Sequence, residues 1–336
     1  MEVDNTYKSE IPAQIIFLQM KKCSYNFFQK NKFLNINIFA KDYFLIRSTL
    51  IDLIKKVSKA LVFKSQTFFL SIYYLDIIII ETTEVLVFNN YTSLALACLV
   101  VASKYCENDP NVPQLPYFIR VYNHIVGNKD PIPISELIYN EVKICKILNY
   151  KLQYYTIYDY NSFFFGHGIL KLEQLKEIKK DKDISFPLYA KKILEKIYKK
   201  SRNYLNIFIN KNICFKYSSL LISIYIMEKS VESIIINESK IVNDVEKIQI
   251  KKKTQKYFKE IMNDFYKINY ENNKEYILLK KEIEPYKDRN KNTESPSINS
   301  AGTPGVTIST GIDLLRTHIH LIIVRYIGVP YRIFVR

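Results

Sequence analysis

The chain has 336 residues, enough for one large domain or two medium ones, and 48% of them are hydrophobic. This apolar content can form a sizeable core and excludes wholesale disorder. Only 7 glycines are present, and the first 300 residues hold just Gly127, Gly166 and Gly168. P-loop, Rossmann and kinase glycine-loop folds need more glycine than this and are excluded, so the composition indicates helices.

The net charge is +16, from 49 basic and 33 acidic residues. A basic face for nucleic acid or an acidic partner would produce such a surplus. An AT-rich coding sequence would also produce it, because Lys, Ile, Asn and Tyr are all abundant. We favour this compositional explanation and do not expect nucleic acid as a partner.

Cysteine and histidine spacing argues against a metal site. The five cysteines form no CxxC pair, and His318 and His320 have no carboxylate or thiol close by in the sequence. We therefore expect no metal and no cofactor, and reduced thiols in an intracellular protein of the nucleus, the cytoplasm or both. The longest apolar run, Leu94 to Ala102, is too short for a membrane span, and the polar start shows no signal peptide.

The first half of the chain predicts a set of about five helices. Residues 1–41 are expected to be a weakly helical or partly ordered extension. Apolar residues then recur at three- and four-residue steps from Asp42 to Leu61, and again after Ser65, a candidate N-cap. Thr92 or Ser93 is expected to open a central helix that is apolar nearly all round. Shorter helices are predicted at 117–124 and, capped by Ser135, up to Leu148.

The second half predicts a similar order. Residues 166–183 carry glycine and charge and are expected to be a linker. An amphipathic basic helix at 189–207, an apolar one at 217–227 and a lysine-rich one at 245–266 follow. This order suggests a degenerate duplication of one five-helix unit within residues 184–284. Residues 285–336 are expected to be a low-complexity linker and an unplaced tail.

Two segments resemble the cyclin box. Thr67–Asp76, with Tyr74, Leu75 and Asp76, is similar to the family's second helix, and Leu94–Glu107, with Ala-Ser-Lys at 102–104, is similar to its third. Further segments resemble the first helix (Ile46–Asp52) and the fifth (Glu141–Leu152, with Thr156 beyond). The resemblance covers residues 44–165 and implies an all-α protein with a first cyclin fold over 42–165 and a second, degenerate one.

The resemblance also implies a function. Cyclins bind a serine/threonine protein kinase, move its αC helix inward and do no chemistry themselves. Lys104 and Glu141 are similar to the family's lysine and glutamate at the kinase interface, and we group Tyr105 and Glu107 with them. From periodicity alone, the alternative for Lys104 and Glu141 is an intramolecular surface ion pair. We expect a heterodimer with such a kinase, and protein substrates of that kinase are possible further partners.

Two further sets of residues follow from the resemblance. Arg47 and Asp76 resemble a structural pair that joins the first two helices, although Ile77 stands where the family usually has arginine. Ile46, Leu50 and Leu53 occupy the positions of a substrate-docking groove. The lysine at position 56 would repel a basic docking peptide, so we favour ordinary helix packing for these three.

A second class of protein stays open. General transcription factors resembling factor IIB use the same duplicated fold to bind DNA and polymerase, and the charge of +16 would suit them. They usually carry an N-terminal zinc ribbon, for which this sequence has no CxxC pair. A scaffold without a kinase is the third alternative. We therefore favour a kinase-regulating cyclin.

Overall fold

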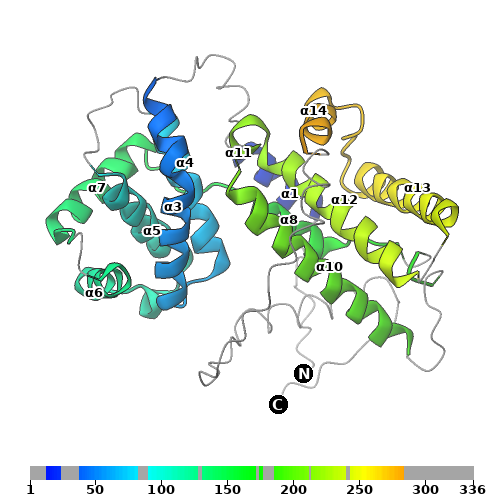
Figure 1. Cartoon of the computed structure of the whole chain (residues 1–336), viewed down its shortest axis with the longest axis horizontal. Coiled ribbons are helices and arrows are strands. Elements are labelled where there is room, and N and C mark those ends of the chain that lie inside the picture. Colours follow the sequence, from blue (N-terminus) through cyan, green and yellow to red (C-terminus); the bar gives the residue numbers. More distant parts are fainter. Residues whose placement is uncertain are drawn as a thin grey trace, which may run out of the picture.

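A computed structural model of the chain describes residues 13–23, 38–81, 90–127, 131–171, 174–176, 185–211, 213–239 and 243–283. All regular elements in these ranges are helical, as Figure 1 shows, which confirms the predicted all-α class. None of the described helices is both long enough and apolar enough to cross a membrane.

The first group of helices is built around α5. It comprises α3 (Ile38–Ala60), α4 (Ser65–Glu81), α5 (Tyr91–Cys106), α6 (Leu115–Val126) and α7 (Ile134–Ile147), at the left of Figure 1. Helix α5 is buried from Ser93 to Ser103 and packs against α3, α4 and α7. A helix that is apolar on all sides can exclude water only when other helices surround it. The predicted central helix is thus confirmed.

Two predicted N-caps are wrong by a few residues. Helix α5 is capped by Asn90, whose side chain accepts hydrogen bonds from the backbone N–H groups of Thr92 (2.8 Å) and Ser93 (3.3 Å). An asparagine cap satisfies amide groups that have no partner inside the helix. Helix α7 follows Pro133, not Ser135, and no side chain caps it.

The second group is built around α12 in the same manner. It comprises α8 (Ile157–His167), α10 (Phe186–Ile209), α12 (Ser219–Glu238), α13 (Asp244–Glu260) and α14 (Lys274–Ile283), with a short α11 (Ile213–Lys216). Helix α12 packs against α8, α10, α13 and α14. The lysine-rich helix predicted to reach residue 266 ends at Glu260 and continues as a π-helical turn, Ile261–Phe265. Helices α8 and α14 were not predicted from the sequence.

The packing of α8 bears on where the two groups divide. Residues 157–167 lie before the predicted linker, but α8 packs chiefly on α12 and less extensively on α10 and on α4 of the first group. This packing favours a division near residues 149–156, ahead of α8, rather than at 166–183. The assignment of the second group as another cyclin fold stays a prediction, as do the domain boundaries. Residues 285–336 lie outside the described residues.

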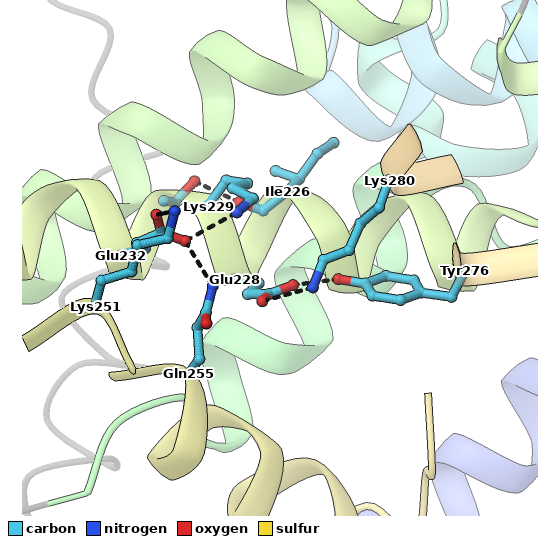
Figure 2. A network of polar contacts seen from close by, with 9 residues as sticks. Ile226, Glu228, Lys229, Glu232, Lys251, Gln255, Tyr276 and Lys280 are labelled. Atoms are coloured by element: carbon cyan, nitrogen blue, oxygen red, sulfur yellow. Dashed lines mark hydrogen bonds and ion pairs between the residues drawn. The ribbon is translucent and has the colours of Figure 1, made fainter. Parts of the chain in front are cut away.

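Buried charges hold α13 and α14 on α12, as Figure 2 shows. Glu228 of α12 is 2% exposed; it accepts hydrogen bonds from the hydroxyl of Tyr276 and, at 3.1 Å, from Lys280 of α14. One turn further, Glu232 forms a 3.2 Å ion pair with Lys251 of α13. Buried carboxylates are stable only with such partners. The second group is thus joined by polar contacts as well as by its apolar core.

The N-terminal extension contributes helix α1 (Ala13–Cys23) to the second group. The ring of Phe17 stacks on Phe163 of α8, with centroids 5.7 Å apart, and lies 6.1 Å from the ring of Tyr266. Phe17 and Met20 are both buried. Helix α1 therefore belongs to the packed structure, although it precedes the first group in the sequence.

Candidate functional site

The structure brings Lys104 and Glu141 together at the surface. The Lys104 ammonium donates a hydrogen bond to Oε1 of Glu141, which closes an ion pair between α5 and α7. The lysine side chain is 49% exposed and the glutamate side chain 19%. Lys104 therefore still has donors that face solvent.

Helix packing fixes where these two side chains stand. Lys104 lies in the last turn of α5, directly after the buried stretch that ends at Ser103. Helix α7 packs through Leu137, Asn140 and Ile144, and the Asn140 amide donates a 2.9 Å hydrogen bond to the hydroxyl of Ser93 on α5. This buried bond sets how α7 lies along α5. Glu141, one residue after Asn140, is thereby directed toward the C-terminal end of α5.

Helix α7 also carries exposed apolar side chains, which we call the apolar strip. Ile134 is 40% exposed, Ile138 47% and Val142 49%, and they follow one another at four-residue steps. Residues spaced in this way lie along one side of a helix. The strip therefore runs along α7, and Val142 stands next to Glu141. A row of apolar residues at the surface is typical of an interaction site.

The other two predicted interface residues, Tyr105 and Glu107, differ in their exposure to solvent. Tyr105 is 44% exposed, beside Lys104. Glu107 is only 9% exposed, and its carboxylate accepts hydrogen bonds from the backbone N–H of Lys64, at 2.7 Å, and from the hydroxyl of Thr67. Both donors lie at the start of α4, so Glu107 caps that helix. Glu107 therefore does not belong with the surface residues Lys104 and Tyr105, because its carboxylate oxygens face inward.

Arg47 and Asp76 form a buried bidentate pair. Nε and Nη2 of Arg47 donate to the two carboxylate oxygens of Asp76 at 2.9 and 2.7 Å, and the Tyr43 hydroxyl donates to the same carboxylate at 2.5 Å. Burial, followed by the nearby Asp76 charge, raises the pKa of Tyr43 well above its usual value, so its proton stays in place for this bond. The guanidinium also lies 4.9 Å from the ring centroid of Phe215 in α11. The pair therefore reaches beyond the first two helices.

The candidate docking groove is not exposed at its centre. Leu50 is 4% exposed and belongs to the core, while Ile46 and Leu53 pack against that core and are partly buried. These positions favour ordinary helix packing over a groove. The spacing of the three residues could not distinguish the two.

A buried central helix wrapped by its neighbours, with an ion pair at its exposed end, is the arrangement expected of a cyclin box. The family model described as "Cyclin, N-terminal domain" matches residues 16–153. This segment is similar to the N-terminal domain of cyclins, and the match supports a regulatory role of the cyclin type. The match begins within α1, covers α3 to α7 and ends before α8. None of the curated proteins matches the chain.

Proposed function

We propose that this protein is the regulatory subunit of a cyclin-dependent-type serine/threonine kinase. The observation that carries the proposal is the surface pair of Lys104 and Glu141 next to the apolar strip of α7. An apolar row flanked by a charge pair fits an amphipathic helix of a partner, which lays its apolar side on the strip. In a kinase, that helix would be αC.

The lysine would act as a hydrogen-bond donor. An ammonium group has three donors, and Glu141 accepts one of them. The others remain for backbone carbonyls at the end of a kinase helix, while Glu141 keeps the lysine oriented. Inward movement of αC would then complete the kinase's own Lys–Glu ion pair, which binds the nucleotide phosphates.

The energetics distinguish an interface pair from a local one. An ion pair as exposed as this one contributes about 0–1 kcal/mol to the stability of the chain. Once a partner covers it, truncation of either residue costs about 2–5 kcal/mol of binding free energy. Loss of binding without loss of stability is therefore the expected signature of Lys104→Ala.

A capture experiment tests the proposal. The tagged full-length chain is used to capture partners from cells of its source, and these are identified by mass spectrometry. We expect a protein kinase with the wild type, and much less of it with Lys104→Ala or Ile138→Asp. Lys59→Ala, at the exposed end of α3, is the matched control and should recover the kinase fully. Capture without any kinase, or equal capture by all variants, would contradict the proposal.

A further inference from the structure

The positive charge of the chain is concentrated on two helices. Helices α10 and α13 carry twelve Lys and Arg residues against four Asp and Glu within 41 residues. The five helices of the first group carry nine against six within 82 residues. Part of this difference arises because α4 and α5 are buried along most of their length, whereas α13 is largely exposed. The exposed positive charge of these helices is therefore concentrated on α10 and α13.

Helix α13 packs with one side only. Thr254 and Phe258 are buried, and Lys251 and Gln255 point toward Glu232 of α12 in Figure 2. The opposite side is exposed, and its residues follow one another at three- and four-residue steps. We call it the outer ridge: Val245, Ile248, Lys252, Lys256 and Lys259. Helical geometry places these five side chains in one row.

The outer ridge is apolar at its N-terminal end and basic along the rest of its length. Val245 is 61% exposed and Ile248 54%, so the N-terminal end is apolar. Lys252 and Lys256, one turn apart, form no ion pair with any described residue. Lys259 is already paired with Glu271, at 2.5 Å. Lys256 also lies close enough to Glu260 to lower the pKa of that carboxyl, but no ion pair holds it. The lysines without an ion pair therefore lie at the middle of the ridge, next to its aliphatic end.

Two of the basic residues of α10 already have polar partners within the chain. Lys196 pairs with Glu238, and Arg202 donates a 2.8 Å hydrogen bond to the hydroxyl of Ser65. Lys192 and Lys199 remain exposed on α10, where exposed Leu188 lies one turn before Lys192 and exposed Ile207 lies about two turns after Lys199. Helix α10 thus lacks the two neighbouring aliphatic residues that the outer ridge has on one side of its lysines, which makes it the natural comparison.

We propose that the outer ridge docks an acidic segment of a partner protein. The partner's carboxylates would face Lys252 and Lys256, and an aliphatic side chain would cover Ile248 and Val245. Charge complementarity selects an acidic partner, and the aliphatic end favours a protein over nucleic acid, which binds through phosphates and aromatic stacking. The ridge lies on the second group and the apolar strip on the first, so this binding goes beyond the proposed kinase role and does not depend on it.

Fluorescence anisotropy with a defined probe tests this inference. The probe is a labelled peptide with four repeats of Glu-Leu-Glu-Glu, titrated with the full-length chain at about 150 mM salt, where charges beyond about 8 Å are screened. We expect Lys252→Glu/Lys256→Glu to weaken binding at least about tenfold, because two attractions become repulsions. Ile248→Ser should weaken it severalfold, and so should replacing each peptide leucine with serine.

A charge-matched control separates a site from diffuse attraction. Lys192→Glu/Lys199→Glu on α10 changes the net charge equally and should leave the affinity within about threefold. Equal weakening by both double variants would overturn the proposal, because only the total charge would then matter. Tighter binding of a short DNA duplex than of the peptide, with the same dependence on Lys252 and Lys256, would also overturn it in favour of a nucleic-acid surface.

Discussion

The guanidinium of Arg47 donates a 2.6 Å hydrogen bond to the backbone carbonyl of Ile209, which lies 162 residues further along the chain. The same guanidinium holds Asp76 in a bidentate pair and is only 1% exposed. Arg47 therefore connects three helices, α3, α4 and the end of α10. From the sequence, Arg47 and Asp76 are expected only to join two helices of the first group. In the structure, Arg47 also couples the first group to the second.

Arg47→Ala should destabilise the chain strongly. Removal of one partner leaves the Asp76 carboxylate buried without its counter-charge, which typically costs about 3–5 kcal/mol in the free energy of unfolding. Urea unfolding followed by circular dichroism measures this loss. Arg47→Lys keeps the charge but cannot form the bidentate contact, so it should recover only part of it.

A double variant separates the charge from the packing. Arg47→Met/Asp76→Leu removes both charges and should be less destabilised than Arg47→Ala, because no buried charge remains unpaired. If Arg47→Ala unfolds at the same urea concentration as the wild type, the pair does not hold the two groups together.

Asp159 should make stability depend on pH. Burial raises the pKa of this carboxyl to about 6, although Thr156 donates hydrogen bonds to it within the capping box of α8. A folded-state pKa above the unfolded value means that the contribution of Asp159 to stability is complete below about pH 4 and is lost as the pH rises through about 6. The wild type should therefore lose about 2 kcal/mol relative to Asp159→Asn between pH 4 and pH 7.

The measurement is the difference in unfolding free energy between wild type and Asp159→Asn across this range. The difference removes the contributions of all other titrating groups. A constant difference, or one that changes in the opposite direction, would mean that the Asp159 carboxyl keeps an ordinary pKa in the folded chain.

Glu107→Gln should affect stability and not binding. The substitution keeps one acceptor oxygen for Lys64 and Thr67 but removes its charge, and a hydrogen bond to a neutral acceptor is weaker by about 1 kcal/mol. Binding to the captured kinase should stay within about twofold, since the carboxylate faces inward. If Glu107→Gln leaves the stability unchanged but binds the kinase much more weakly, Glu107 contacts the kinase and the assignment to a helix cap is wrong.

DNA binding should be weak and insensitive to sequence. At about 150 mM salt, we expect duplex DNA to dissociate at about 10⁻⁴–10⁻⁶ M, the range of non-specific electrostatic binding. Titration of two duplexes of unrelated sequence checks this. Nanomolar affinity for one of them would instead favour the alternative that resembles factor IIB.

The first group of helices could be predicted because two independent signals agree there. Leu94 to Ala102 is apolar on every side, and the letters around Lys104 and Glu141 resemble a known motif. The ends of helices could not be placed as well, because Asn90, Thr92 and Ser93 are all good caps and only the hydrogen bonds select Asn90. The sequence therefore predicts the all-α class correctly, but not the residue at which each helix begins.

The surface features could not be predicted for a different reason. The four-residue steps from Ile134 to Val142 are the same for a helix side in the core and for one that meets a partner. The long-range contact of Arg47 with Ile209 involves a backbone carbonyl, which has no sequence signature. Helix α8 was missed because its aromatic residues, Phe163 to Phe165, show no clear period.

The most direct test of the kinase proposal is the dissociation constant of the captured, purified kinase for the wild type, Lys104→Ala and Glu141→Ala. Each variant should bind about 30-fold more weakly or worse, which corresponds to about 2 kcal/mol, with unchanged helical content. Activation of the kinase should fall in parallel at subsaturating concentrations of the variant chain. If both variants bind within about twofold of the wild type, Lys104 and Glu141 form only a local ion pair and the kinase interface lies elsewhere.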